Sequence, residues 1–553
     1  MGEIMADNRL TRLVSGPGLG LILLSALMSF SAAAQSEKNS IFIDQTTAAT
    51  GGQYTLSQQG SGNSIGSDAS DRFSVSGDGQ TVGITQFGDG GLLTGAIVGD
   101  NVVYDILMDG VGNTVDLGQT VESGNRIDGA EVDLDIIGEN NLLILDHAAQ
   151  EFAENLFVDI DITGSDNDYT AIVDSNDIFL SHQIDGNFNI INSTQAQSSG
   201  HSSTLIIAGG DQNEFILEQV SFLSASDDSD IFGSGNTVKV KQLGNGESND
   251  LTLTGDGNSV TVEQNAASVA SVTAQIDVNG GGNELLVVQE TFASTSDQTS
   301  ITGSGNLVTT LQGENGGQNI LTVDGNGNTV DTEMNSVGSV SVVDTGVSGN
   351  GNDVDIVQFA DSDVTSNVSI SGDNNTFGSN QTGTVGYSSV ASISGSNNSV
   401  DLIQFGAGQT TDSILDVAGD SNQVSVDQNL LTAGAAASSL FVTGDTNNLS
   451  LTQSGGGDYA SDLSVNGTLN TILLSQTGIT GSQSNISVDG ASNNINVAQS
   501  GPVLSTANIV IDGNSNAITV TQDDALSAVV DVAIIGDGST MNITQSTTSI
   551  PFE

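Results

Sequence analysis

A short motif recurs along almost the whole chain at a nearly constant interval. It reads G-x-x-N-x-Φ-x-Φ-x-Q, where Φ is apolar, as in GSNNSVDLIQ from Gly395, GDTNNLSLTQ from Gly444 and GNSNAITVTQ from Gly513. Asn stands at the third position after the glycine in 19 copies, and Gln stands at the ninth in 17. From Gly186 onward the copies are 22 to 25 residues apart, a period that is typical of repeat architectures. The 21 anchoring glycines are residues 60, 77, 110, 138, 164, 186, 210, 233, 255, 280, 303, 325, 349, 372, 395, 419, 444, 467, 490, 513 and 536.

Each repeat contains two arms in which apolar and polar residues alternate. A period of two places every second side chain on the same face of an extended chain, so the alternation predicts strands. In one copy, Ile495 and Val497 share a face and are expected to pack against Ile486 and Val488 of the preceding arm. The glycine before the Asn suits a tight turn. One repeat is therefore predicted to be strand, turn, strand, turn.

A single repeat cannot be stable alone, because its two arms bury too little apolar surface to offset the entropy of ordering them. Repeat units of this kind are stabilised by neighbours that cover both of their faces. We therefore predict an all-β fold, a β-solenoid of stacked strand-turn-strand repeats of about 23 residues, with an amyloid-like arrangement.

The Asn and Gln residues are predicted to form two ladders along the stack. A side-chain amide carries both a donor and an acceptor, so each can bond to its copy about 4.8 Å away. A one-residue slip would leave many of these amides buried and unpaired, so the ladders would set the register. The first ladder comprises Asn236, Asn258, Asn283, Asn306, Asn352, Asn375, Asn398, Asn422, Asn447, Asn470, Asn493 and Asn516. The second comprises Gln242, Gln264, Gln289, Gln312, Gln358, Gln381, Gln404, Gln428, Gln453, Gln476, Gln499, Gln522 and Gln545.

The motif resembles the repeat of curlin, the amyloid subunit of bacterial curli fibres. The second half of that family's pattern, S-x5-Q-x-G-x-G-N-x-A-x3-Q, is matched by GSGNTVKVKQ from Gly233 and GDGNSVTVEQ from Gly255. The segment from Gln58 to Asn63 matches the fuller Q-x-G-x-G-N string. The resemblance implies export through an outer-membrane secretion pore, a nucleator subunit as a partner, and fibres that serve cell adhesion and the biofilm matrix.

The chain also departs from the curlin pattern. The first Gln of the family repeat is usually Val or Ile here, as at Val488, so only one arm is expected to carry an amide ladder. In an irregular stretch, residues 99–185, His147 and Val173 stand at the Gln position. The chain holds many more repeats than a curlin subunit, which leaves open a monomeric acidic β-solenoid adhesin that does not polymerise.

The charge balance excludes nucleic acid as a partner. The formal net charge is −60, with only 7 Lys and Arg residues against 67 Asp and Glu residues. A nucleic-acid-binding protein needs clustered basic side chains to displace counterions. The chain has no cysteine, so its stability cannot come from disulfides.

The N-terminus is typical of a cleavable signal peptide. Arg9 and Arg12 precede an apolar run at 18–30, and small residues up to Ala34 suit a cleavage site. A membrane anchor is the alternative, although the run is shorter than the roughly 20 apolar residues of a spanning helix. We therefore expect the chain to be secreted and extracellular. The predicted segments are 1–34 (signal peptide), 35–76 (atypical repeats), 77–545 (solenoid, irregular over 99–185) and 546–553 (tail).

We expect a structural protein that assembles with copies of itself, and not an enzyme. The three histidines, at 147, 182 and 201, are not accompanied by a serine elbow or a cysteine nucleophile. We expect no cofactor. The turn aspartates are interpreted as solvated carboxylates, with weakly bound Ca²⁺ as the open alternative. These aspartates are Asp256, Asp373, Asp420, Asp445 and Asp537.

Carboxylates stacked about 4.8 Å apart repel one another by roughly 0.9 kcal/mol per pair even in water. We therefore expect acid or added Ca²⁺ to accelerate assembly of the purified chain. Thioflavin-T growth curves between about pH 4 and about pH 8, with and without Ca²⁺, measure this effect. Curves that do not change under either condition would contradict it.

Overall fold

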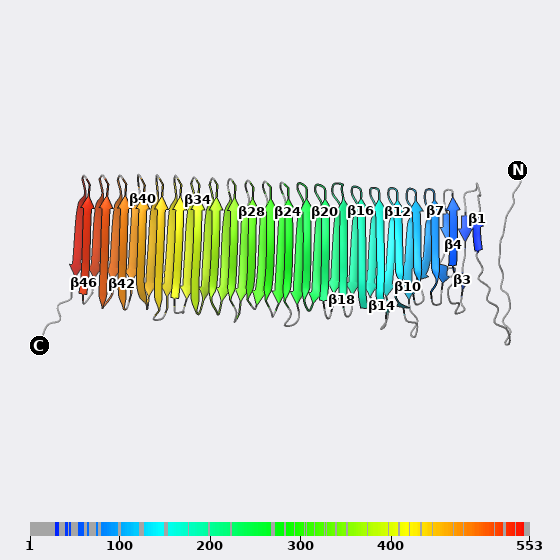
Figure 1. Ribbon diagram of the computed structural model, residues 1–553, viewed down its shortest axis with the longest axis horizontal. Coiled ribbons are helices and arrows are strands. Elements are labelled where there is room, and N and C mark those ends of the chain that lie inside the picture. Colours follow the sequence, from blue (N-terminus) through cyan, green and yellow to red (C-terminus); the bar gives the residue numbers. More distant parts are fainter. Residues whose placement is uncertain are drawn as a thin grey trace.

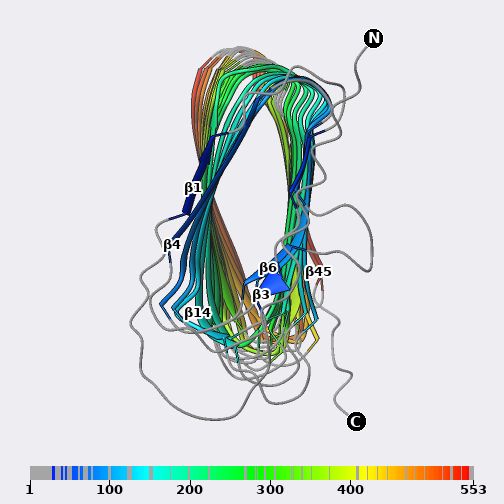
Figure 2. The ribbon, with the colours of Figure 1, turned by 90° about the vertical axis from the view of Figure 1, so that its right-hand side faces the viewer.

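The computed structural model describes 28–546 with short gaps. The residues outside the description are 1–27, 32–38, 42–43, 46–52, 60–62, 66–72, 76–78, 98–100, 121–126, 149–152, 175, 197–199, 222–223, 267–270, 281, 283, 292–293, 304, 306, 315, 326, 328, 338–339, 350–351, 373, 396, 407–409, 420, 432–433, 445, 468, 470, 479, 491, 514, 524–526, 537 and 547–553. The described residues contain strands and turns but no helix. The strands form two parallel sheets that face each other along one long axis (Figures 1 and 2). The predicted fold class, an all-β solenoid of stacked repeats, is confirmed.

The first sheet, called sheet A, contains 23 described strands. They are β1 (Met28–Ser31), β4 (Gln53–Gln59), β7 (Thr81–Phe87), β9 (Val103–Asp109), β11 (Ile127–Asp128), β12 (Glu131–Ile137), β14 (Ala153–Thr163), β16 (Asn176–Asp185), β18 (Gly200–Ala208), β20 (Ser224–Phe232), β22 (Glu247–Thr254), β24 (Val272–Asn279), β26 (Thr295–Thr302), β28 (Gly317–Asp324), β30 (Ser341–Ser348), β32 (Val364–Ser371), β34 (Gly386–Ser394), β36 (Thr410–Ala418), β38 (Ala435–Thr443), β40 (Asp458–Asn466), β42 (Gly481–Asp489), β44 (Leu504–Asp512) and β46 (Ser527–Ile535).

The second sheet, called sheet B, contains the remaining described strands. They are β2 (Asn39–Ile41), β3 (Asp44–Gln45), β5 (Asn63–Ile65), β6 (Phe73–Val75), β8 (Leu92–Ile97), β10 (Thr114–Thr120), β13 (Leu142–Ala148), β15 (Asp168–Asp174), β17 (Ile190–Ala196), β19 (Glu214–Val220), β21 (Thr237–Gly244), β23 (Ser259–Ala266), β25 (Glu284–Thr291), β27 (Leu307–Glu314), β29 (Thr329–Ser336), β31 (Asp353–Ala360), β33 (Thr376–Gly383), β35 (Ser399–Gly406), β37 (Gln423–Leu430), β39 (Asn448–Gly455), β41 (Thr471–Thr477), β43 (Asn494–Ser500), β45 (Ala517–Asp523) and β47 (Thr540–Ser546).

One rung of the solenoid consists of a sheet A strand, a short turn and the sheet B strand that follows it. Each strand pairs in parallel with the corresponding strand of the next rung, so equivalent residues align in columns. Val238, Val260 and Leu285, for example, occupy one column of sheet B. In-register pairing satisfies the backbone groups of both neighbours and stacks like side chains on one another.

The apolar residues of both sheets point into the space between them. Along β24 every second residue is buried, from Val272 through Ala274 and Ile276 to Val278, and the residues between them are exposed. The inner faces join in one continuous core of Val, Ile and Leu that runs the length of the stack. The alternation of buried and exposed residues therefore occurs twice in each rung, once in each strand.

The anchoring glycines form the turn from sheet A to sheet B. The backbone N–H of Gly255 donates to the carbonyl of Asn279 in the next rung at 2.8 Å. The φ of Gly255 is 145°, and a Cβ atom there would clash with the carbonyl oxygen of Gly233 in the preceding rung. Only glycine fits, because the turns of successive rungs approach each other backbone to backbone.

The prediction that Gly77 anchors a repeat is wrong. The arm after it, β7, lies in sheet A and pairs with β9, whereas the arms that follow later anchors lie in sheet B. Gly88 stands in the glycine column instead, with its N–H donating to Asp109 O beside Gly110 at 2.8 Å. Gly77 itself lies outside the described residues.

The stack continues across residue 77, because β4 pairs with β7 in seven-residue register. The stretch 99–185 is continuous as well, since β9, β12, β14 and β16 pair in unbroken order. Its irregular spacing arises between strands, as between the end of β10 at Thr120 and the start of β11 at Ile127. Extra residues are accommodated in connections more easily than in the ladder.

The predicted signal peptide lies outside the described residues except for β1, which pairs with β4. The tail lies outside them after Ser546. Within the described part of the chain, no helix has the length and apolar content needed to cross a membrane.

Replacement of Gly255 by Ala is expected to destabilise the protein by roughly 2 kcal/mol or more, because the new Cβ combines an unfavourable φ with a backbone clash. Gly346, in β30, provides the control, since a Cβ there would have open space around it. Gly346→Ala should leave stability nearly unchanged. Urea unfolding of the two variants measures the difference, and equal effects would contradict the close approach.

Candidate functional site

The described Gln residues of the motif form a buried hydrogen-bonded column on the inner face of sheet B. The Nε2 group of Gln264 donates to Gln242 Oε1 at 2.8 Å, and that of Gln289 donates to Gln264 Oε1 at 2.9 Å. A second N–H of Gln264 is close to the backbone of sheet A, with Thr273 O at 2.9 Å from Nε2. Each glutamine therefore ties two rungs together and also ties the two sheets together.

The glutamine column runs in two stretches. The first includes Gln195 to Gln312, and the second includes Gln358 to Gln545. Met334 interrupts the column on β29, and there Gln358 Nε2 donates to the hydroxyl of Ser341 at 3.1 Å. The predicted ladder members that these bonds join are Gln242, Gln264, Gln289 and Gln312, then Gln358, Gln381, Gln404, Gln428, Gln453, Gln476, Gln499, Gln522 and Gln545.

The asparagines stack in a column too, but they bond differently from the prediction. Asn258 Oδ1 accepts from the backbone N–H of Asn236 at 2.7 Å, and Asn258 Nδ2 donates to Gly233 O at 3.2 Å. The short Asn side chain reaches the turn backbone and satisfies its groups, so the expected amide-to-amide ladder is wrong for this position. The described members, all buried, are Asn236, Asn258, Asn352, Asn375, Asn398, Asn422, Asn447, Asn493 and Asn516. Asn283, Asn306 and Asn470 lie outside the described residues.

Side-chain bonds between asparagines of this column occur nearer the N-terminus. Asn141 Nδ2 and Asn167 Nδ2 each donate to the next Asn Oδ1 at 3.1 Å, which joins Asn141, Asn167 and Asn189. In the rungs before these, Gln86 Nε2 donates to Gln58 Oε1 at 3.1 Å within sheet A. In these first rungs the amide bond lies in sheet A, whereas the glutamine ladder of the later rungs lies in sheet B.

Sequence reasoning missed a serine column that faces the glutamine ladder from sheet A. Ser438 Oγ donates to Gln428 Oε1 at 2.8 Å, and Gln453 Nε2 lies 3.3 Å from Ser438 Oγ. Ser461 and Ser484 accept from their glutamines in the same way. A signal was present, because each of these serines stands six residues before an anchoring glycine.

The outer faces carry the negative charge. Asp105, Asp133 and Asp159 align in one column of sheet A, with Asp135 and Asp161 beside them. Partial burial raises the pKa of Asp133, and the neighbouring carboxylates raise it further. In-register stacking thus brings like charges together at a cost that the buried contacts must offset.

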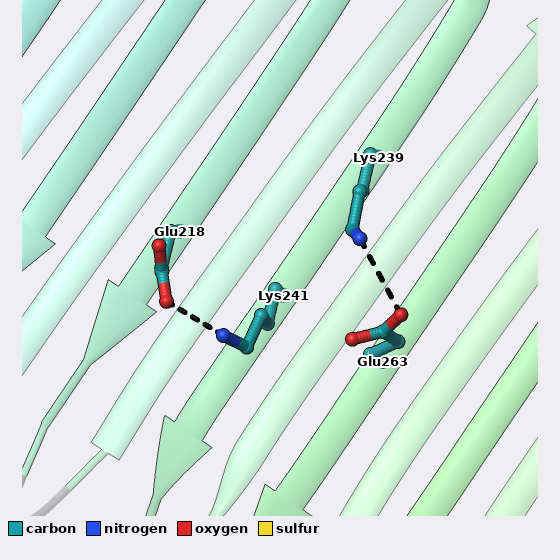
Figure 3. A network of polar contacts seen from close by, with 4 residues as sticks. All are labelled: Glu218, Lys239, Lys241 and Glu263. Carbon is teal, nitrogen blue, oxygen red and sulfur yellow. Dashed lines mark hydrogen bonds and ion pairs between the residues drawn. The ribbon is translucent and has the colours of Figure 1, made fainter.

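The described part of the chain has only two Lys or Arg residues, and both are paired on the outer face of sheet B (Figure 3). Lys241 Nζ lies 2.7 Å from Glu218 and Lys239 Nζ lies 3.5 Å from Glu263, each on a neighbouring rung. The bond to Glu218 raises the pKa of Lys241. These pairs are a third or more exposed, so each contributes only about 0–1 kcal/mol.

The described residues contain no cluster of His, Cys, Asp or Glu suited to a metal ion. Asp256 is the one predicted turn aspartate among them, since Asp373, Asp420, Asp445 and Asp537 lie outside. His182 is fully buried between Tyr169 and Phe215, and this burial lowers its pKa to about 4. His201 is also buried, with Nε2 3.1 Å from Val220 O. The side chain of His147 is not among those described.

Comparisons with known protein families, curated proteins and solved structures found no match to this chain. The resemblance to curlin therefore remains a prediction that depends on the repeat motif. The arrangement itself, an apolar core bordered by two long stretches of hydrogen-bonded glutamines, is suited to holding rungs in register.

Replacement of Gln404 by Leu is expected to destabilise the protein by about 1–3 kcal/mol, because it leaves the buried donor of Gln428 without its acceptor. Gln275→Leu is the matched control, since Gln275 points outward from β24. That variant should change stability by less than about 0.5 kcal/mol. Urea midpoints of the two variants provide the measurement, and similar losses would show that the ladder contributes no specific stability.

Proposed function

We propose that this chain is a secreted structural protein that assembles into curli-like surface fibres, which serve cell adhesion and the biofilm matrix. Copies join by continuing the rung-on-rung contact from one chain to the next. The proposal rests chiefly on the C-terminal rung, formed by β46 and β47, which is open in the described part of the chain.

The open rung presents the same apolar columns that are buried everywhere else. Ile518 and Val520 of β45 are 1% and 0% exposed, whereas Met541 and Ile543, next in those columns, are 54% and 39% exposed. An uncovered strand edge with an apolar inner face is a template for further pairing. The predicted tail, 546–553, lies outside the described residues after Ser546.

The amide column also ends in a form that can accept another rung. Gln545 Nε2 donates backward to Gln522 Oε1 at 3.1 Å, as do the glutamines from Gln381 onward, which directs the Gln545 carbonyl along the stack. A following rung with an amide donor in this column would extend the ladder. This polarity supports growth in one direction at this end.

The second candidate is a monomeric acidic adhesin. The formal net charge of −60 and the aspartate columns favour it, because laterally or axially joined copies repel one another at low ionic strength. We propose no catalytic role and no cofactor in either case. A nucleator subunit and a secretion pore remain partners that the curlin resemblance suggests.

A double variant, Val532→Lys with Ile543→Lys, tests the fibre proposal by placing charge on the inner faces of the open rung. We expect the unaltered mature chain to form fibres with cross-β diffraction, and this variant to stay folded without elongating. Thr519→Lys, on the exposed face of β45, adds charge away from the contact and should still form fibres.

Electron microscopy and fibre diffraction provide the readout, with far-ultraviolet circular dichroism as the folding control. An unaltered chain that stays monomeric under all conditions would contradict the fibre proposal and favour the adhesin. Fibre growth by the double variant at the normal rate would contradict the role of the C-terminal rung.

A further inference from the structure

Two carboxyl groups point into the apolar core in the middle of the solenoid. Asp227, on β20, is 3% exposed, and Asp297, on β26, is 0% exposed. Both occupy one inner column of sheet A, in which Asn249 and Ala274 stand between them. No other aspartate in the described part of the chain is buried, so these two depart from the pattern that places charge in solvent.

The two sites are built in the same way. In each, the asparagine of the next rung donates to the carboxyl Oδ2, from Asn249 to Asp227 at 3.0 Å and from Asn319 to Asp297 at 3.2 Å. In each, a hydroxyl two residues farther along the same strand also donates, from Ser229 at 2.9 Å and from Thr299 at 3.1 Å. The same cluster therefore occurs twice. It consists of an Asp, a hydroxyl residue on the same strand and an Asn on the next rung.

No cation neutralises these carboxyls among the described residues that face them. His201 on β18 and Glu247 on β22 share the inner face around Asp227, and Asp228 lies on the outer face of the same strand. The strands of sheet B opposite, β19, β21 and β23, contribute apolar residues, glycine and glutamine to that face. His182 lies two rungs earlier, on β16. Around Asp297, the strands β24, β25 and β28 contribute no titratable side chain to the inner face. On β27, Glu314 stands in the column of the buried residues Thr291 and Ser336.

Burial raises the pKa of Asp227 to about 7 and that of Asp297 to about 7, despite the hydrogen bonds that favour the ionised form. Burial also raises the pKa of Glu247 to about 7. A proton also completes the hydrogen bonding, because Asn249 Oδ1 and Asn319 Oδ1 are buried without a partner. A neutral carboxyl and a carboxamide can donate to each other reciprocally, whereas a carboxylate can only accept.

We propose that the middle of the solenoid, from β20 to β28, is a proton-controlled segment: it closes tightly when Asp227 and Asp297 carry protons and loosens when they ionise. This inference concerns the fold of a single chain and does not depend on whether the chain forms fibres. The segment from β20 to β28 would therefore open more readily as the pH of the medium rises.

The direction follows from proton linkage. The carboxyls bind protons more tightly in the folded chain than in the unfolded one, so their favourable contribution is complete below about pH 4 and is lost as the pH rises toward about 7. His182 acts in the opposite direction, because its lowered pKa makes the folded chain reject a proton. His182 and Glu247 are the same in every variant, so the difference between the variants isolates the contribution of Asp227 and Asp297.

Hydrogen exchange of backbone amides on the monomeric full chain tests the proposal. Protection of 224–324 is compared with that of 410–512, between about pH 5 and about pH 8, after correction for the intrinsic exchange rate. In the unaltered chain, protection of the first segment should fall by roughly tenfold per pH unit for each carboxyl that the opening exposes. The double variant Asp227→Asn with Asp297→Asn should lose the part of this dependence that the two aspartates contribute and keep only the part that Glu247 contributes.

Asp277→Asn, on the exposed face of β24, is the matched control and should keep the pH dependence. If the double variant does not fold, the single variant Asp297→Asn should reduce the slope by the contribution of one carboxyl, roughly a factor of ten per pH unit. An unchanged slope in the Asp variants would overturn the proposal. It would also be overturned if 224–324 and 410–512 lost protection equally as the pH rises.

Discussion

Parallel pairing of each rung with an almost identical rung is the contact on which the rest of the structure depends. It satisfies the backbone groups of every strand, and it aligns apolar residues with apolar residues along the axis. Neither sheet would be stable on its own, since each needs the other to cover its inner face. The turns contribute only because glycine allows their backbones to approach as closely as the strands do. Every column therefore inherits the same spacing, whatever side chain occupies it.

Exact repetition also creates the main hazards of this architecture, a slip in register and the stacking of like charges. Buried amides counter the slip, because each misplaced Gln would cost about 1–3 kcal/mol as an unpaired group. The interruption at Met334 indicates what the column requires, since Ser341 takes over as the partner of Gln358. The buried N–H of Gln358 therefore needs an acceptor, and a serine hydroxyl can replace the amide oxygen of a glutamine. Like charges are placed outside, where solvent and salt weaken their repulsion.

The polar residues of the core modify this scheme without breaking it. Serines opposite the glutamines add bonds between the sheets, and the two aspartate clusters are held by an asparagine on the next rung. Buried carboxyls are unfavourable when ionised and acceptable when neutral. The same core thus contains groups that fix the register at any pH and groups whose contribution changes with pH.

The sequence by itself determined the strand arms, the turn glycines and the stacking of equivalent positions, because period-two alternation and glycine geometry are local properties that every copy repeats. It also placed each Gln, whose side chain is long enough to reach its copy on the next rung. Only the tertiary structure decided that Gly88, and not Gly77, stands in the glycine column beside Gly110. The alternating arm 81–87 fits either sheet. It lies in sheet A because it pairs there with β4 and β9. The structure likewise decided that most described asparagines bind the turn backbone, because a side chain one methylene shorter meets the nearest carbonyl before it meets its copy.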